Sequence, residues 1–136
     1  AGFVAACAHP AAAGPPALAG VVEARVLMVI DGDTIEVAAH VWVGQEATTA
    51  VRLAGVDAPE LFRPKCAAER ARAERAKEFA AEFFGAGPAR LFDVRHGKYA
   101  GRVVARMENA AGADLGAALV AAGLAAEGKR SWCAQS

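Results

Sequence analysis

Apolar and polar positions along the first half of the chain alternate in short runs that are separated by turn residues. Runs of β-branched and other apolar residues at 21–30, 35–43 and 48–56 have the length and spacing of strands. Two further runs of this kind, at 89–95 and 102–108, follow after a longer interval. The pattern therefore predicts five short strands, three in a first group and two in a second.

A long helix is predicted between these two groups. Residues 66–84 contain alanine and charged residues throughout but neither glycine nor proline, and this composition favours a helix. Gly85 ends the helix, and the charged residues at 69–78 are expected to lie mostly on its solvated face. The predicted buried stripe consists of Ala73, Ala76, Phe79, Ala80 and Phe83.

A second, shorter helix is predicted at 113–123, with Asp114 near its start and Gly123 as its stop. The order is then three strands, a helix, two strands and a helix, which indicates a mainly β fold with some α structure (α+β). Five short strands with an intervening helix suit a small Greek-key barrel of the oligonucleotide/oligosaccharide-binding (OB) type. We expect the long helix after the third strand and the short helix after the fifth.

The length of 136 residues and a hydrophobic content of 55% predict one folded domain, which we place at 21–136. The first twenty residues contain no Asp, Glu, Lys or Arg and are rich in alanine, proline and glycine. We interpret 1–20 as the remnant of a processed export signal followed by a spacer. The letters VAAC, ending at Cys7, resemble a lipoprotein cleavage site, which would place a lipid anchor on this cysteine. AAA at 11–13 would equally suit ordinary signal cleavage.

Export would bring the chain into an oxidising compartment, where cysteines form disulfides. Cys66 opens the long predicted helix, and Cys133 belongs to the otherwise unexplained ending SWC. We expect these two cysteines to form a disulfide that ties the polar tail to the helix. Two unrelated small apolar residues are the alternative interpretation.

The net charge of the chain is zero, so the composition does not support a general affinity for polyanions. The charges are nevertheless unevenly distributed. Residues 21–62 carry seven acidic residues against two arginines, whereas residues 63–136 carry thirteen Lys or Arg against eight acidic residues. An acidic half suits a cation and a basic half suits an anion such as phosphate, although solvated surface is the simpler interpretation.

Candidate chemistry begins with two carboxylates, Asp31 and Asp33, which flank a glycine within the stretch VIDGDTIEV. Alone, this stretch is a tight hairpin turn, because Asp-Gly is a common turn dipeptide. One half of a metal site is the second interpretation, and it needs further residues to support it.

A second group of charged residues follows the third predicted strand. The stretch RLAGVDAPE contains Arg52, Asp57 and Glu60, and YAGR places Arg102 at the start of the fifth strand. In a compact barrel the first hairpin turn and the end of the third strand can be neighbours, so the carboxylates would converge. Converging carboxylates repel unless a cation lies among them, and oxygen ligands favour a hard ion such as Ca²⁺. Two arginines beside that cation would hold a phosphate through paired N–H bonds.

The stretches VIDGDT, RLAGVDAPE, YAGR and LGAALVAAGLA resemble, in order and spacing, the staphylococcal nuclease (thermonuclease-like) family over about residues 21–126. None of these motifs is specific alone, but the ordered set is. Members of this family have the OB barrel and hydrolyse the phosphodiester bonds of DNA and RNA with Ca²⁺. The resemblance implies a Ca²⁺-dependent, sugar-nonspecific nuclease. We expect it to prefer single strands and to act as a monomer outside the cytoplasm.

By position, the resemblance assigns metal ligation to the carboxylates of Asp33 and Asp57 and to the backbone carbonyl of Ala58, with Asp31 as a nearby acid. Ala58 keeps this carbonyl, although it lacks the hydroxyl of the threonine that is often found there.

The resemblance also assigns catalytic roles to Arg52, Glu60 and Arg102. Glu60 would act as the general base or orient the attacking water. Both arginines would stabilise the charge that develops on the phosphoryl oxygens, and Arg102 would also favour departure of the leaving oxygen.

Two features depart from the family pattern. KYAGR has one residue more than the commoner KYGR, so the register of Arg102 depends on a small bulge. Lys98 and Tyr99 in this segment are the expected substrate-binding residues. The segment after Leu124 lacks the tyrosine that often flanks the nucleobase. Tyr99 or Trp132 could take this role, although an aromatic residue near a chain end is more often simply packed.

Two other functions are compatible with the sequence. A non-catalytic module on the same barrel would bind nucleic acid or a protein, but such modules usually lack a ligand or the base, and here all are present. A surface-anchored structural lipoprotein depends on Cys7 alone. His9, His40 and His96 do not have the spacing of a zinc site.

Overall fold

The computed structural model describes residues 17–133, and its strands and helices follow one another in the predicted order. The strands are β1 (Val21–Asp31), β2 (Thr34–Trp42), β3 (Gln45–Leu53), β4 (Ala89–His96) and β5 (Arg102–Glu108). The helices are α1 (Ala67–Phe84) and α2 (Leu115–Ala121). The long helix follows the third strand and the short helix follows the fifth, as predicted.

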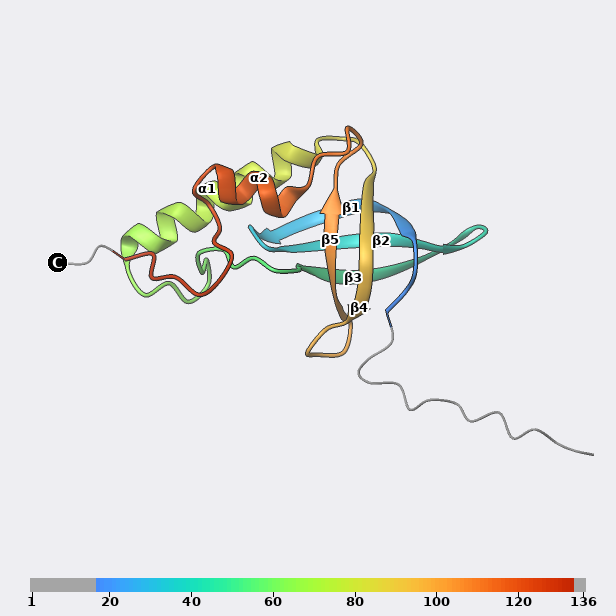
Figure 1. The fold of residues 1–136 in the computed structure, drawn as a ribbon, viewed down its shortest axis with the longest axis horizontal. Helices are drawn as coiled ribbons and strands as arrows, with labels where there is room; N and C mark the ends of the chain where they lie inside the picture. Colours follow the sequence, from blue (N-terminus) through green and yellow to red (C-terminus); the bar gives the residue numbers. More distant parts are fainter. Residues whose placement is uncertain (1–16, 134–136) are drawn as a thin grey trace, which may run out of the picture.

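The strands close into a barrel in the order β1-β2-β3-β5-β4 (Figure 1). β1 pairs with both β2 and β4, and the parallel pair β3–β5 completes the circle. Each strand therefore has a hydrogen-bonded neighbour on both sides, which removes the exposed edges of an open sheet. The five-stranded barrel of the OB type is confirmed.

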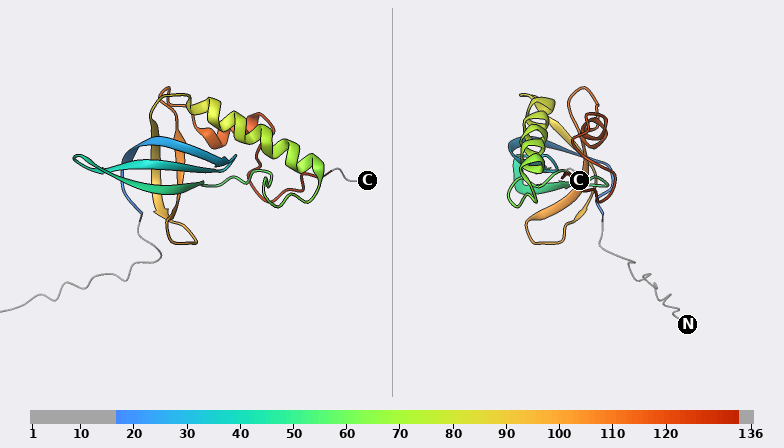
Figure 2. Two further views of the ribbon diagram at one scale, coloured as in Figure 1. Left: turned by 180° about the vertical axis from the view of Figure 1, so that it is seen from behind. Right: turned by 90° about the vertical axis from the view of Figure 1, so that its left-hand side faces the viewer.

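Alternate residues of the strands fill the barrel. Ile35, Val37 and Val51 are fully buried, as are Leu91 and Met107 from the last two strands. Their spacing follows from the pleat, which sends successive side chains to opposite faces. α1 and α2 cover one end of the barrel, and the tip of the β2–β3 hairpin projects from the other end (Figures 1 and 2).

The third strand differs from the prediction at both ends. It begins at Gln45, because Gly44 forms the tip of a tight turn at a positive φ of 71°. It ends at Leu53 and not at Val56, because Gly55, with a φ of 75°, turns the chain away from the sheet. The residues between Leu53 and α1 therefore form a loop, and this loop contains the candidate site residues Asp57 and Glu60.

α1 buries much of its predicted stripe. Its buried residues are Glu69, Ala73, Ala76, Ala80 and Phe84. Phe79 and Phe83 are partly buried against the core, and the last fully packed position is Phe84. The prediction that the charges at 69–78 lie on the solvated face is wrong for Glu69, which is 4% exposed. Its partners are described with the site.

The β1–β2 turn packs directly on α1. A Cβ atom at Gly32 would lie 2.7 Å from the Cβ of Ala76 and 3.3 Å from the Cβ of Ala58. Real Cβ atoms do not approach so closely, so glycine is required here because backbone and helix are in contact. This contact places Asp31 and Asp33, on either side of the glycine, next to the helix and the loop after β3.

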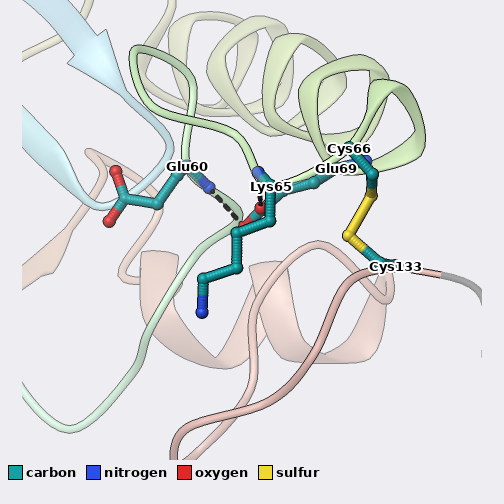
Figure 3. Close-up of a disulfide and its surroundings, with 5 residues drawn as sticks. All are labelled: Glu60, Lys65, Cys66, Glu69 and Cys133. Atoms are coloured by element: carbon teal, nitrogen blue, oxygen red, sulfur yellow. Dashed lines mark hydrogen bonds between the residues drawn. A yellow bond between two sulfur atoms is a disulfide. The ribbon is translucent and has the colours of Figure 1, made fainter.

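Cys66 and Cys133 form a disulfide, as predicted (Figure 3). Cys66 is also the N-cap of α1. The tail is held by packing as well, since Trp132 is buried and the guanidiniums of Arg72 and Arg130 lie 5.7 and 4.8 Å from its ring centroid. Burial of Trp132 and the disulfide therefore hold the tail together.

The export signal, both cleavage sites and Cys7 fall in residues 1–16, outside the described residues. Part of the predicted spacer does lie on the barrel, because the N–H of Leu18 donates to the carbonyl of Val94 on β4 at 2.8 Å. Between residues 17 and 133, no helix has the length and apolar character needed to cross a membrane.

Reduction of the Cys66–Cys133 bond should lower the free energy of unfolding by about 4 kcal/mol. The bridge joins residues separated by 67 positions, and its loss frees the unfolded chain by the corresponding loop-closure entropy. Chemical denaturation of the oxidised and reduced wild-type chain measures the difference. The reduced chain is a better comparison than an alanine variant, because the Cys66 sulfur stays available as the N-cap. Equal stability of the two forms would contradict the prediction.

Candidate functional site

Arg52 lies at the centre of the charged residues that the sequence singles out. Its guanidinium bridges two carboxylates: Nη1 is 3.1 Å from Oδ2 of Asp33, and Nη2 is 2.9 Å from Oδ1 of Asp57. Nη1 also donates to the carbonyl oxygens of Leu53 and Val56, at 3.3 and 2.9 Å. The guanidinium thereby joins the end of β3, the loop after it and the β1–β2 turn.

Asp33 makes a second set of links between the same segments. Its Oδ2 accepts a hydrogen bond of 2.8 Å from the N–H of Ala58, and its backbone carbonyl accepts one of 2.9 Å from the N–H of Leu53. The loop is held from the other side by paired backbone bonds between Asp57 and Ala126, at 2.8 and 2.9 Å. The first hairpin turn and the end of the third strand are therefore neighbours, as the sequence predicts.

Burial raises the pKa of Asp33 from 3.8 to about 7. Asp31 adds to the rise through a hydrogen bond and through its charge, whereas the Arg52 guanidinium and the Ala58 N–H lower the pKa without offsetting burial. The folded chain therefore favours neutral Asp33. The stability from this group is fully present below pH 3.8 and is lost as the pH rises through about 7. A bound cation would reverse the preference, because it favours the ionised carboxylate.

Glu60 lies apart from this group of bonded residues. Its side chain is exposed, and its carboxylate points away from Glu69 and the disulfide (Figure 3). Its backbone is held by Glu69: the N–H of Glu60 donates to Oε2 at 3.1 Å, and the N–H of Lys65 donates to Oε1 at 2.7 Å. This role of Glu69 was not predicted. Its signal in the sequence is the segment CAAE, where Glu69 stands three residues after the N-cap Cys66, the spacing of a capping box.

Arg102 begins β5 and lies on the same outer face of the barrel as Arg52. The parallel register pairs Ala50 with Arg102 and Arg52 with Val104, and alternate residues of a strand share a face. Within the KYAGR segment, Gly101 has a φ of 77°, and its carbonyl accepts a hydrogen bond of 3.1 Å from the N–H of Ala50 on β3. In the range 17–133, Arg102 makes no ion pair.

The two predicted aromatic candidates differ in exposure. Tyr99 is 63% exposed and lies with Lys98 in the turn between β4 and β5. Trp132 is buried under Arg72 and Arg130, so it is packed and is not available to take the place of the missing tyrosine. A groove of about 420 Å³ runs beside Arg52, and Lys129 from the segment after α2 lines it. Lys129 was not predicted as a site residue, because only the tertiary structure brings this segment to β3.

The oxygen donors around Arg52 match Ca²⁺ in kind. Asp33 and Asp57 offer carboxylates and Ala58 a backbone carbonyl, and hard oxygen donors are the ligands that Ca²⁺ takes. The guanidinium supplies the positive charge that holds the two carboxylates together. In the part of the chain that the structure describes, no three Asp, Glu, His or Cys side chains gather as a metal site.

Comparison with known proteins gives one family match. Residues 50–134 match the family model for staphylococcal nuclease homologues, a span that includes Arg52, Glu60 and Arg102. No curated protein matches the chain. The β1–β2 turn precedes the matched residues but is bonded to them through Asp33. The barrel and the matched span together show that the chain belongs to the family of staphylococcal nuclease homologues.

Proposed function

We propose that the chain is a Ca²⁺-dependent nuclease that hydrolyses the phosphodiester bonds of both DNA and RNA. Membership in the family supports a nuclease-like protein. The observation that carries the proposal is the shared outer face of Arg52 and Arg102, with Asp33 and Asp57 bonded to Arg52. Two guanidiniums beside a pair of carboxylates suit a phosphodiester, because negative charge grows on its oxygens in the transition state.

Arg52 retains donors for a phosphate. A guanidinium has five N–H groups. Nη1 is engaged with two carbonyls and with Asp33, and Nη2 with Asp57. Nε makes no hydrogen bond within residues 17–133, and the guanidinium edge that Nε forms with Nη2 would face the phosphate. Two parallel N–H groups on such an edge bind two phosphoryl oxygens at once.

Asp33, Asp57 and the carbonyl of Ala58 would hold Ca²⁺, with Asp31 nearby. When bound, the ion neutralises charge on the phosphoryl oxygens and helps to orient water. Arg52 forms ion pairs with both carboxylates, and this shared partner supports their assignment as a pair of ligands.

The remaining residues act on the phosphodiester from β3, from β5 and from the loops next to these strands. Glu60 takes the proton of the attacking water or orients that water. Arg52 and Arg102 stabilise the charge on the phosphoryl oxygens, and Arg102 also favours departure of the leaving oxygen. Lys98 and exposed Tyr99 contact the rest of the strand. A preference for single strands follows, because an exposed aromatic ring stacks on unpaired bases.

The disulfide fits an oxidising compartment. We therefore include export in the proposal, with residues 1–20 as the processed segment and spacer and 21–136 as the nuclease domain, acting as a monomer. Lipid attachment at Cys7 is a separate prediction that concerns residues outside the described part.

Purified wild-type chain should cleave single-stranded DNA and RNA in Ca²⁺ and not in chelator. Glu60→Gln should lower kcat by about 10²–10⁴-fold, the usual contribution of a positioned acid or base, while nucleotide and Ca²⁺ binding persist. Steady-state cleavage assays and calorimetric binding measure both effects. Glu78→Gln, the same substitution on the exposed face of α1, is the matched control and should behave as wild type.

Two outcomes would contradict this proposal. A wild-type chain that binds single-stranded DNA but cleaves neither nucleic acid would be the non-catalytic OB module. Full activity of Glu60→Gln would remove Glu60 from the mechanism.

Arg102→Lys should lower kcat by about 10²-fold although the charge is kept. Lysine cannot present two parallel N–H groups to two phosphoryl oxygens, and one lost transition-state donor typically costs this much. Arg102 is a cleaner test than Arg52, whose replacement would also disturb Asp33 and Asp57. Arg75→Lys on the exposed side of α1 is the control. Wild-type kcat in Arg102→Lys would show that this arginine acts only as a point charge or not at all.

The affinity for Ca²⁺ should fall about tenfold between pH 8 and pH 6. A pKa of about 7 at Asp33 means that a proton competes with the metal in this range. Calorimetric titration at several pH values measures the affinity and the proton released on binding. Asp33→Asn should bind Ca²⁺ more weakly and lose this pH dependence. An affinity of the wild-type chain that is constant from pH 6 to pH 8 would rule out Asp33 as a titrating ligand.

A further inference from the structure

A buried carboxylate at the start of α1 holds the loop that carries Glu60. Glu69 is 4% exposed. Its two oxygens accept hydrogen bonds from the N–H of Glu60 at 3.1 Å and from the N–H of Lys65 at 2.7 Å (Figure 3). A buried carboxylate requires such donors, because an unpaired charge away from water is strongly unfavourable. The two bonds hold the loop 60–65 at both of its ends.

Glu60 depends on its backbone more than the other residues of the site do. Asp33 and Asp57 are joined through a guanidinium, whereas the Glu60 side chain makes no hydrogen bond or ion pair within residues 17–133. The position of its carboxylate is therefore set by the course of the loop. Asp33 fixes the chain just before Glu60 through the N–H of Ala58, and Glu69 fixes Glu60 itself through its N–H.

Glu69 is itself held on a rigid element. It lies in the first turn of α1, an 18-residue helix in which Ala73 and Ala76 are fully buried. Its N–H donates to the sulfur of Cys66 at 3.4 Å, and Cys66 is bonded covalently to Cys133. The loop is thus fastened to a packed helix and not to another loop.

We propose that Glu69 is a positioning residue for the nuclease reaction: it fixes the backbone of Glu60 so that the general base reaches the attacking water. The catalytic part of this inference rests on the proposed function. Proton transfer needs a heavy-atom distance of about 2.6–3.2 Å, and displacement by ~1 Å costs on the order of 10²-fold in rate. Loss of the Glu69 bonds therefore reaches the chemistry through Glu60.

A purely structural role for Glu69 makes different predictions. An acidic residue in the first turn also stabilises a helix through the helix dipole, and loss of that effect would change unfolding and leave kcat as it is. Glu69→Gln separates the two roles. Glutamine has nearly the same shape, but one of its two acceptor oxygens becomes an NH₂ group, which cannot accept a hydrogen bond from a backbone N–H.

Steady-state cleavage of single-stranded DNA at saturating Ca²⁺ tests the catalytic part. We expect Glu69→Gln to lower kcat by about tenfold or more, with KM and the Ca²⁺ requirement unchanged. Glu78→Gln on the same helix should leave kcat unchanged. In a Glu60→Gln background, Glu69→Gln should cause no further loss, because both act through one base. Wild-type kcat in Glu69→Gln, or equal losses in both backgrounds, would overturn the proposal.

Amide hydrogen exchange tests the positioning without any cleavage. The N–H groups of Glu60 and Lys65 should be protected in the wild-type chain and should exchange about tenfold faster or more in Glu69→Gln, while Ala73 and Ala76 keep their protection. A chain that shows this pattern but cleaves nothing overturns the proposed nuclease function and leaves Glu69 as a structural clamp. Rapid exchange of both amides in the wild-type chain overturns the clamp itself.

Discussion

The buried carboxylate of Asp33 imposes the main constraint on this end of the barrel. A carboxylate with so little access to water needs donors from the protein, and it finds them in the N–H of Ala58 and the guanidinium of Arg52. These partners come from the loop after β3 and from β3 itself, so the β1–β2 turn can only be buried if all three segments meet. The cost that remains after this pairing is visible in the raised pKa of Asp33.

A second buried carboxylate, that of Glu69, binds backbone N–H groups of the same loop, a few residues after Ala58. Asp33 takes the N–H of Ala58, and Glu69 takes those of Glu60 and Lys65. The loop between β3 and α1 contains no helix or strand of its own. Three of its backbone N–H groups, those of Ala58, Glu60 and Lys65, donate instead to side chains of the β1–β2 turn and of α1. In this way an exposed side chain, that of Glu60, is presented from a backbone that is held in place.

The barrel brings the acidic half of the chain next to the basic half. β3 belongs to the acidic half of the chain and β5 to the basic half, and the parallel β3–β5 pair brings the two halves together. Arg52 is one of only two basic residues in 21–62, and it lies where its own half supplies two carboxylates. Two cationic residues, Arg52 and Lys129, and two anionic residues, Asp57 and Glu127, line one groove.

The sequence by itself determined the strands, the helices, the closed barrel, the hairpin turn at Gly32 and the disulfide. The strands, the helices and the turn depend on periodicity, turn residues and composition, which are local properties of the chain. The disulfide was predicted from the export expected for residues 1–20 and from the otherwise unexplained ending SWC. The position of Asp33 next to the loop after β3 was predicted from the compactness of a small barrel.

Only the tertiary structure decided which polar groups meet. In the sequence, Glu69 is one of several charged residues on a predicted helix. Its burial in the structure depends on backbone donors up to nine residues earlier in the chain. The sequence leaves open whether Trp132 stacks on a base or is packed, and the structure shows it packed under Arg72 and Arg130. Burial is the main reason that the pKa of Asp33 is raised, and this burial depends on the packing of the β1–β2 turn against α1 and the loop after β3. Burial and hydrogen-bond partners arise from packing between distant segments, and a local pattern carries no information about them.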